Sequence, residues 1–324
     1  MERENERRGL APPPHRLLSP AQNHNFINMT IHKAVLPVAG MGTRLLPATK
    51  CQPKEMLPVG YKPVVQYVVE EMVGEGIDKF LFITGRKKRS IEDHFDDDPE
   101  LEARLSGKAE AIDELDYAGR GIDFLYARQR RPLGNADAVR LAAQFVGKES
   151  FVVGFGDTII YSRRDPGVVG RMIAAHEEHQ AAATIAVWEV PREEVRKYGV
   201  VQPAAGEAGD EFAIADIVEK PRPEDAPSSL AVAARYVFTP EIFAAIAATR
   251  PGLGGELWLT DAIRLLIAGG AKVRCLRLQP DEQRYDIGTP MTYYRAFADF
   301  ALRDPQHGPA FAQYLREKLD RENL

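Results

Sequence analysis

The sequence predicts an α/β fold: a three-layer sandwich in which a mostly parallel, mixed sheet is covered by helices on both faces. Two observations predict it. From Ile31 onward, short apolar runs alternate with helix-like segments, a pattern typical of parallel sheets with crossover helices. Residues 198–240 instead contain several short strand-like runs and turn residues but no convincing helix, which indicates a small β-rich lid over the edge of the sheet.

The expected elements alternate regularly in the first half of the chain. Strand-like runs occupy residues 33–39, 79–85, 123–128, 150–157 and 182–190, and helical spacing marks residues 64–76, 90–95, 135–146 and 168–180. A charged helical insert is expected around residues 97–118. After the β-rich region, a helix at 259–270, a strand at 271–278 and a helix at 290–304 restore the α/β pattern.

The two ends of the chain differ from this main domain, which is expected to span residues 30–305. Residues 1–29 are charged and then rich in proline, without periodicity or the apolar core of a secretory signal, so we expect a disordered tail. Residues 306–324 contain an amphipathic helical pattern suited to packing on a neighbouring subunit.

Composition excludes several classes of protein. A formal charge of -5 over 324 residues argues against a general nucleic-acid or membrane-surface binder, so an anion site must be a local basic cluster. The two cysteines, Cys51 and Cys275, have no metal-ligand spacing, which argues against a disulfide scaffold or structural zinc and fits a reducing, cytoplasmic compartment. No apolar run approaches the length of a membrane span.

The most informative stretch is "AVLPVAGMGTRLLPATKCQPKEMLPV", residues 34–59. Gly40 and Gly42 follow an expected buried strand, where their backbone N–H groups could approach a phosphate, and Arg44, Lys50 and Lys54 add positive charge to the same loop. A lone GxG is more often a turn with solvated cations. The third glycine of the dinucleotide-binding fingerprint and the GK[ST] of the P-loop are both missing.

The full string G-x-G-T-R-x-x-P-x-T-K-x-x-P-K-E-M-L-P resembles the signature of the sugar-phosphate nucleotidylyltransferases, a family with a Rossmann-like catalytic domain. The segments "PATK" and "PKEMLP" are most similar to the bacterial members that use UTP and glucose 1-phosphate. The resemblance continues through "SIEDHF", "YGVV", "VVEKP" and "YDIGTPMTYYRAF", and so covers roughly residues 31–300.

The resemblance implies roles for the glycine loop and its neighbours. Arg44 and Lys54 are expected to bind the phosphates as catalytic residues, and the segment Ala39, Gly40, Gly42 and Thr43 is expected to bind the nucleotide. Lys50 has two interpretations, a phosphate contact or a solvated loop lysine. The base is expected to meet Ala39, Gly40 and Glu55, together with Gln129 and Gly134 of "YARQRRPLG".

Two aspartates are expected to bind Mg²⁺. A carboxylate at a strand end, such as Asp157 in "VVGFGD", is more often a cap or turn residue than a ligand, but Asp286 in "RYDIGTP" resembles the second metal-binding aspartate of the family. Two carboxylates, phosphate oxygens and waters suit the preference of Mg²⁺ for hard oxygen ligands. The histidines His94, His176 and His179 fall in helical segments and are expected to be structural.

The sugar is expected to bind at Gly199, Glu219 and Lys220. By themselves, Glu219 and Lys220 read as a surface ion pair contributing at most about 1 kcal/mol. The resemblance implies instead that Glu219 accepts hydrogen bonds from sugar hydroxyls, that Lys220 neutralises the sugar phosphate, and that Gly199 lets the sugar approach the backbone.

The chain departs from the family pattern at two places. Ala136 and Asp137 replace the glycine and histidine of the usual "LGLGHAV", and Leu257 and Trp258 stand where typical members are more polar. We expect Asp137 to be structural and base selection to rest on Glu55, Gln129 and Gly134. The departures leave the base and sugar preference open.

The expected activity is transfer of uridylyl from UTP to α-D-glucose 1-phosphate, giving UDP-glucose and pyrophosphate by in-line attack at the α-phosphorus. The alternatives are a pyrophosphorylase for another sugar 1-phosphate or for dTTP, and a non-catalytic sugar-nucleotide sensor. No nucleic-acid or membrane partner is expected, and the family resemblance implies a homodimer or homotetramer.

Overall fold

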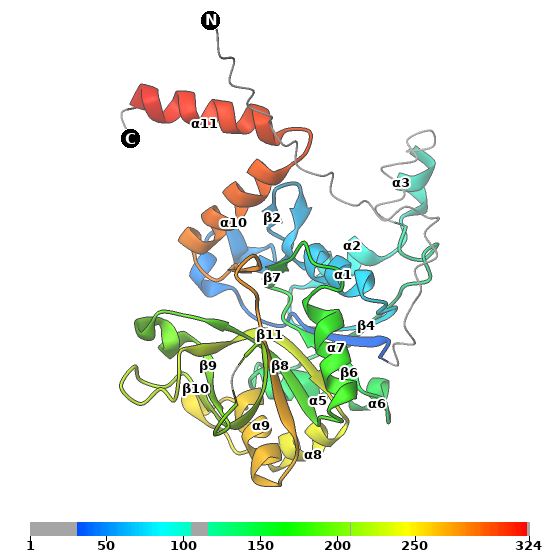
Figure 1. Cartoon of the computed structure of the whole chain (residues 1–324). Helices are drawn as coiled ribbons and strands as arrows, with labels where there is room; N and C mark the ends of the chain where they lie inside the picture. Colours follow the sequence, from blue (N-terminus) through cyan, green and yellow to red (C-terminus); the bar gives the residue numbers. More distant parts are fainter. Residues whose placement is uncertain (1–30, 105–115, 208, 323–324) are drawn as a thin grey trace, which may run out of the picture.

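The computed structural model describes residues 31–104, 116–207 and 209–322 of the chain (Figure 1). Within these residues, the centre is a nine-stranded sheet with strand order β5-β4-β1-β6-β11-β8-β12-β10-β9. The strands are β1 (Lys33–Pro37), β4 (Lys79–Thr84), β5 (Asp123–Arg128), β6 (Phe151–Gly154), β8 (Ala183–Glu189), β9 (Gly199–Pro203), β10 (Glu211–Glu219), β11 (Leu230–Phe238) and β12 (Val273–Arg277).

The strand that precedes the glycine loop lies inside the sheet. β1 pairs in parallel with β4 on one side and β6 on the other. Val35 faces one hydrophobic core and Ala34 and Leu36 face the other, and all three are fully buried. A strand buried on both faces needs a continuous apolar run. The prediction of a buried strand at this position is confirmed.

Two strands, β10 and β11, run antiparallel to their neighbours in this otherwise parallel sheet. β9 and β10 pair at the edge, where the β-rich lid was expected. β11 belongs to the same β-rich region of the sequence but lies in the middle of the sheet, between β6 and β8. Because β9 also pairs with β11, at Val200 and Ala231, the sheet curls at this end.

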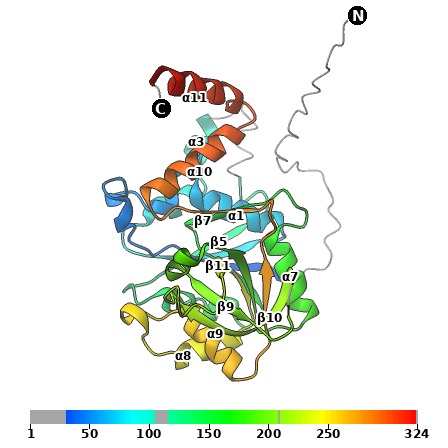
Figure 2. The same ribbon diagram turned by 60° about the vertical axis from the view of Figure 1, so that its left-hand side comes forward.

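Helices cover both faces of the sheet, as the three-layer prediction requires (Figures 1 and 2). Apolar side chains of one group of helices pack into one core, and those of a second group pack into the other. The first group is α1 (Val64–Gly74), α2 (Arg89–Phe95) and α7 (Val168–Glu178), and the second is α5 (Asn135–Arg140), α6 (Ala143–Val146), α8 (Glu241–Ala248) and α9 (Leu259–Ala268).

Two small antiparallel pairs and several short helices complete the fold. The pairs are β2 (Pro58–Val59) with β3 (Lys62–Pro63), and β7 (Thr158–Tyr161) with β13 (Gln283–Asp286). The short helices are α3 (Pro99–Arg104) and the 3₁₀ helices η1 (Thr43–Leu45), η2 (Ala48–Lys50), η3 (Lys54–Met56), η4 (Arg192–Lys197) and η5 (Leu253–Gly255).

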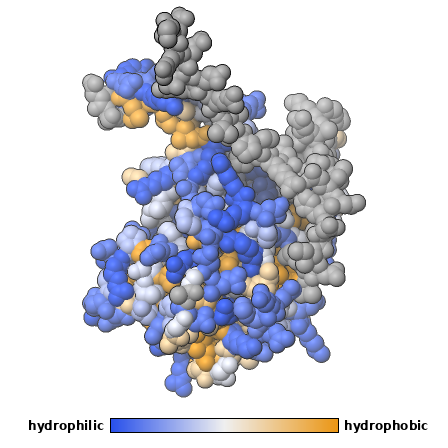
Figure 3. Space-filling view, viewed as in Figure 1, coloured by the Kyte–Doolittle hydropathy of each residue, from blue (hydrophilic) through white to orange (hydrophobic). Residues whose placement is uncertain are grey.

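The last two helices form an arm that leads away from the sheet. α10 (Pro290–Arg303) begins at a capping box between Thr289 and Thr292, and α11 (Gly308–Glu322) lies at the outer end of the arm in both Figure 1 and Figure 2. Figure 3 shows apolar side chains gathered along α11 and its junction with α10.

Several expectations lie partly or wholly outside the described residues. Residues 1–29 do, and of the charged insert only its two ends are described, the first of which contains α3. The division into residues 30–305 and 306–324 stays a prediction. Among the described residues, no helix has both the length and the apolar character needed to cross a membrane.

Candidate active site

The loop after β1 folds back on itself around its two glycines. Gly42 adopts a left-handed conformation with φ of 64°, which favours glycine, and its carbonyl accepts a 2.7 Å hydrogen bond from the Thr49 hydroxyl. A Cβ built on Gly40 would lie 3.6 Å from Cε of Lys54. The loop therefore brings its own later lysine back beside the first glycine.

A hollow of about 190 Å³ opens at this loop. Arg44 is exposed at its rim, and Lys54 is mostly buried at its wall. The lining residues are Met41, Gly42, Thr43, Arg44, Leu45, Lys54 and Gly288. Because Gly288 comes from the segment after β13, the hollow joins two parts of the chain that are far apart in sequence.

Lys54 forms an ion pair with Asp157, which lies between β6 and β7. Burial acts to lower the pKa of the Lys54 ammonium, but the charges of Asp157 and Glu55 outweigh it and hold that pKa above its ordinary value. Burial acts to raise the pKa of Asp157, but Lys54 holds it below the ordinary value. Both groups therefore carry their charges at neutral pH.

Asp286 and Arg44 complete this cluster. Asp286 ends β13 and pairs in register with Thr158, the residue after Asp157. A Cβ built on Gly288 would lie 2.6 Å from Oδ1 of Asp286 and 3.2 Å from Nη2 of Arg44, so both side chains reach the same glycine. The structure therefore brings Arg44, Lys54, Asp157 and Asp286 together, and their roles stay predictions.

The two aspartates provide a partial set of metal ligands. In the described part of the chain, no group of three or more His, Cys, Asp or Glu side chains could hold a metal ion. Mg²⁺ usually takes one or two carboxylates and completes its octahedral shell with substrate phosphates and water. Asp157 and Asp286 at adjacent strand ends, beside a basic loop, fit an ion that binds together with a nucleotide.

Arg284 is a residue of this site that was not assigned from the sequence. Its guanidinium lies 3.4 Å from Oδ2 of Asp286 and within 5.4 and 5.1 Å of the ring centroids of Trp188 and Tyr198. Its charge also helps to lower the pKa of Asp157. The only feature of the sequence that could have indicated Arg284 is its position two residues before Asp286 in "RYD", because its aromatic neighbours lie far away in sequence.

Glu55, which is expected to meet the base, forms a buried ion pair. Its carboxylate is 2% exposed and accepts a 2.6 Å hydrogen bond from Lys88, which is itself buried. Burial outweighs the charge of Lys88 and raises the pKa of the Glu55 carboxyl. In this conformation Glu55 faces a lysine in the protein interior, so a base contact would require that pair to open.

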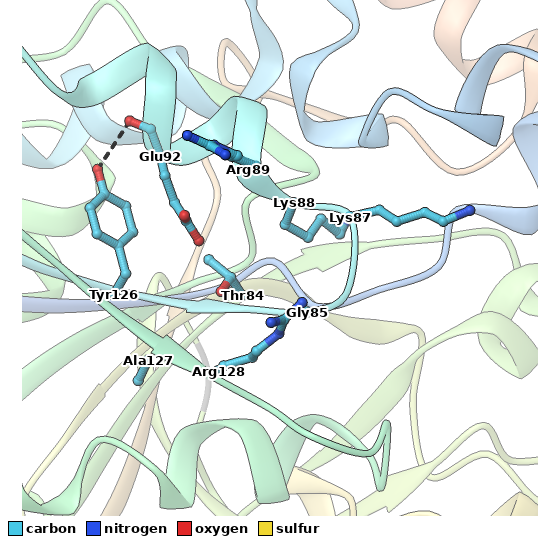
Figure 4. Close-up of a pocket in the computed structure, with 9 residues that line it drawn as sticks. All are labelled: Thr84, Gly85, Lys87, Lys88, Arg89, Glu92, Tyr126, Ala127 and Arg128. Carbon is cyan, nitrogen blue, oxygen red and sulfur yellow. Dashed lines mark hydrogen bonds between the residues drawn. The ribbon is translucent and has the colours of Figure 1, made fainter.

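A second hollow of about 280 Å³ lies beside the Glu55–Lys88 pair, at the ends of β4 and β5 (Figure 4). Its lining residues are Thr84, Gly85, Lys87, Lys88, Arg89, Glu92, Tyr126, Ala127 and Arg128. A Cβ on Gly85 would lie 2.9 Å from the carbonyl oxygen of Ala39, so this hollow adjoins the start of the glycine loop.

Gln129 and Gly134, the residues expected at the base, lie together at the end of β5. The Gln129 carboxamide donates a 3.1 Å hydrogen bond to the Gly134 carbonyl and a 2.9 Å hydrogen bond to the Asp137 carboxylate. Gly134 has φ of 111°, and a Cβ there would lie 2.3 Å from the carbonyl oxygen of Leu257. This position therefore requires glycine for both conformation and space.

The two places where the sequence departs from its family are in direct contact. The Leu257 N–H donates to the Leu133 carbonyl at 2.8 Å, and the Ala136 N–H donates to the Leu257 carbonyl at 3.0 Å. Asn135 also accepts a 2.8 Å hydrogen bond from the Leu259 N–H. The turn at residues 133–137 and the segment at residues 257–259 thus form one unit.

The residues expected at the sugar also lie together. Gly199 of β9 pairs with Glu219 of β10, and the Glu219 carboxylate accepts a 2.9 Å hydrogen bond from Thr260. Lys220 Nζ lies 3.3 Å from the Glu219 carboxylate and 3.7 Å from the ring centroid of Trp258. Burial outweighs the charge of Lys220 and raises the pKa of Glu219.

Lys50 and the three histidines are not among the residues that line the hollow at the glycine loop. Lys50 is exposed. His94 lies 3.1 Å from the Gln66 amide oxygen, His176 is buried 3.2 Å from the Thr184 hydroxyl, and His179 lies 3.7 Å from Glu211. Each of the three histidines therefore contacts a residue outside the hollow at the glycine loop.

Comparison with known proteins identifies the family. The family model described as nucleotidyl transferase matches residues 33–302. A UTP–glucose-1-phosphate uridylyltransferase from Bacillus subtilis is 40% identical over 296 residues, which cover 91% of this chain and 99% of the relative. The chain belongs to the nucleotidyl transferase family.

Two solved structures of similar nucleotidyl transferases support the fold. A UTP-bound UGPase from Acinetobacter baumannii superposes with a TM-score of 0.79 at 37% identity, covering 89% of this chain and 99% of that one. A UDP-glucose pyrophosphorylase complexed with UDP-glucose has a TM-score of 0.76 at 36% identity, covering 83% and 98%. Nucleotidyl transferases of this kind generally use a divalent metal ion.

Proposed function

We propose that this nucleotidyl transferase transfers uridylyl from UTP to α-D-glucose 1-phosphate, producing UDP-glucose and pyrophosphate. The similar enzyme from Bacillus subtilis and the two structures above carry names with UTP, glucose 1-phosphate or UDP-glucose in them. The observation that carries the proposal is the cluster of Arg44 and Lys54, which line the hollow at the glycine loop, with Asp157 and Asp286 in contact with residues of that lining.

The chemistry needs charge neutralisation more than covalent help. A phosphate oxygen of glucose 1-phosphate attacks the α-phosphorus of UTP, and the bond to pyrophosphate breaks. Arg44 and Lys54 offer fixed positive charge where negative charge accumulates. Among the described contacts, Lys54 uses one of its three N–H donors on Asp157, which leaves two for phosphate oxygens.

Mg²⁺ is the proposed metal, with Asp157 and Asp286 as its protein ligands. When bound, it would neutralise phosphate charge and orient the triphosphate. The ammonium of Lys54 now occupies one side of the Asp157 carboxylate, so metal and lysine would share that group. Both partners are charged at neutral pH, which suits a carboxylate that bridges a cation and a metal.

The base and the sugar are assigned to opposite sides of the phosphates. On the base side, Ala39, Gly40, Gln129 and Gly134 are proposed to hold the uracil, and Glu55 joins them only if its pair with Lys88 opens. The sugar side is supported by three residues that already lie together in the structure. These are Gly199, Glu219 and Lys220, with Glu219 to accept from hydroxyls and Lys220 to pair with the sugar phosphate.

The alternative is the same reaction with another sugar 1-phosphate or with dTTP. The observation that favours it is the stacking of Lys220 on Trp258, because an apolar ring beside the sugar phosphate changes the surface that a hexose would meet. A non-catalytic sensor is a weaker alternative, since a sensor would have no need for the complete charged cluster.

Pyrophosphate release across a panel separates these functions. UTP, dTTP and CTP are each paired with several sugar 1-phosphates in the presence of Mg²⁺. The proposal predicts the highest kcat/KM for UTP with glucose 1-phosphate. A higher value for another pair would establish the alternative, and absence of release with binding of nucleotide would establish the sensor.

A reducing, cytoplasmic location is proposed for the protein, and the free cysteines Cys51 and Cys275 are consistent with it.

A homodimer or homotetramer is proposed to form through the arm of α10 and α11. Tyr294 of α10 and Tyr314 and Leu319 of α11 are exposed apolar side chains on this arm. Light scattering of the full chain and of a Tyr314→Glu, Leu319→Glu variant tests this proposal. A monomeric mass for the full chain would contradict it.

A further inference from the structure

Asp137 contacts the carboxamide of Gln129, which is proposed to bind the base. It is 4% exposed, in the first turn of α5, and both of its carboxylate oxygens are occupied. Oδ1 accepts from Nε and Nη2 of Arg140, at 3.2 and 2.7 Å, and Oδ2 accepts from Nε2 of Gln129 at 2.9 Å. Asp137 thus links a half-exposed arginine to a buried glutamine.

The chemistry of these partners fixes which way the Gln129 amide points. A carboxylate and a backbone carbonyl can only accept hydrogen bonds, so the group that faces Asp137 and the Gly134 carbonyl must be the NH₂ of Gln129. Turning the amide over would set its oxygen against two acceptors. The amide oxygen is therefore left as an unused acceptor among the described contacts.

We propose that Asp137 is a positioning residue that holds the Gln129 amide with its oxygen towards the base, and so selects nucleotides whose base has an N3–H group. The inference rests on the proposed function, because it takes Gln129 as the residue that meets the base. It departs from the expectation that Asp137 is structural and takes no part in base selection.

The base edges give this arrangement a direct consequence. Uracil and thymine both present an N3–H donor between two carbonyl oxygens, and a fixed amide oxygen can accept from it. Cytosine presents an unprotonated N3, which would meet the amide oxygen as acceptor against acceptor. The arrangement therefore separates UTP from CTP and does not separate UTP from dTTP.

The test is Asp137→Asn, with kcat/KM measured for UTP, dTTP and CTP. With Arg140 donating to the oxygen of the new side chain, its NH₂ would face the NH₂ of Gln129. Two donors cannot bond, and the Gly134 carbonyl alone still favours the original direction, so the Gln129 amide is no longer fixed and can present its NH₂ to the base. The UTP to CTP ratio of kcat/KM should fall about tenfold or more, while the UTP to dTTP ratio stays within about twofold.

Arg140→Ala is the matched control. It removes the outer partner of Asp137 but leaves an acceptor-only carboxylate against Gln129, so the UTP to CTP ratio should stay within about twofold of the unmodified protein. Equal losses for all three nucleotides in Asp137→Asn would show a merely structural role and overturn the inference.

Two outcomes need a different measurement: an Asp137→Asn variant that does not fold, and an unmodified protein that is inactive. If Asp137→Asn does not fold, equilibrium binding of UTP and CTP to Asp137→Ala replaces it, and an unchanged ratio of the two dissociation constants overturns the inference. If the unmodified protein releases no pyrophosphate from UTP with any sugar phosphate, the proposed function fails, and the same binding ratio still decides whether Asp137 sets base selection.

Discussion

Gly134→Ala tests the geometry that joins the base side of the site to the sugar side. The backbone at Gly134 has φ of 111° and ψ of 173°, a region open essentially to glycine alone. The new methyl group would lie 2.3 Å from the carbonyl oxygen and 2.6 Å from the nitrogen of Leu257. Both contacts are backbone atoms, so no side chain can rotate away to relieve them.

The expected cost follows from these two effects. Holding a non-glycine residue in such a conformation costs about 1–3 kcal/mol, and forcing an extra methyl group into packed structure costs about 1–3 kcal/mol more. The turn can escape the overlap by moving away from Leu257. It then loses the hydrogen bonds that Leu257 makes to Leu133 and Ala136, each contributing about 1 kcal/mol. Either route destabilises the protein by about 2 kcal/mol or more.

Urea unfolding and the KM for UTP measure the result. The KM should rise, because the Gly134 carbonyl holds the Gln129 amide. Gly74→Ala is the control, since a Cβ there, at the end of α1, meets nothing within 4 Å, and the change should be neutral or stabilise by up to about 1 kcal/mol. A Gly134→Ala protein within about 1 kcal/mol of the unmodified protein, with an unchanged KM for UTP, would refute this account of the turn.

Three further predictions concern the metal, the phosphates and pH. Asp157→Asn and Asp286→Asn should keep the fold and lower kcat by orders of magnitude, and near-normal activity at limiting Mg²⁺ would remove that residue from the metal site. Lys54→Ala should lower kcat by about 10²–10³, whereas Lys220→Ala should mainly raise the KM for glucose 1-phosphate; a change in the KM for UTP alone in both variants would contradict these roles. Burial lowers the pKa of His176 to about 4, below the ordinary value near 6.5, so the unfolded chain binds the proton first. The free energy of unfolding should therefore fall by up to about 3 kcal/mol as the pH drops from 6.5 towards 4. His176→Gln should remove most of this dependence in unfolding measured at pH 7 and pH 4.5, and an unchanged slope would contradict it.

Local patterns predicted much of the phosphate side of the site. A strand that is buried on both faces of the sheet requires a continuous apolar run in the sequence. The five-residue strand β1 has such a run at Ala34, Val35 and Leu36. The glycine loop follows β1 and Asp157 follows β6 in the main sheet, where the ends of neighbouring parallel strands meet at one edge. Asp286 ends β13 of the small β7–β13 pair and reaches the site because it pairs with Thr158, the residue after Asp157. The strand-end pattern therefore indicated that Asp157 lies near the glycine loop, whereas the position of Asp286 depends on the pairing of β13 with β7.

Contacts between distant segments were not predictable in the same way. β11 looks like the strands beside it in sequence, but its place in the middle of the sheet depends on pairing with β6 and β8. Lys220 and Trp258 are 38 positions apart and Gln129 pairs with Asp137 across a turn, so neither partner choice appears in a local pattern. Glu55 was expected to meet the base because of the family resemblance, and nothing in its own segment indicates its pair with Lys88.

The most direct test of the central claim follows the α-phosphorus of UTP. The protein is incubated with Mg²⁺, glucose 1-phosphate and UTP that carries ³²P at the α-position, with Asp286→Asn and a chelator-treated sample alongside. We predict that the label enters UDP-glucose and that the released pyrophosphate is unlabelled, with little transfer in either control. Label that stays in UTP, or that reaches UDP-glucose equally well in Asp286→Asn, would contradict the assignment of this cluster to uridylyl transfer.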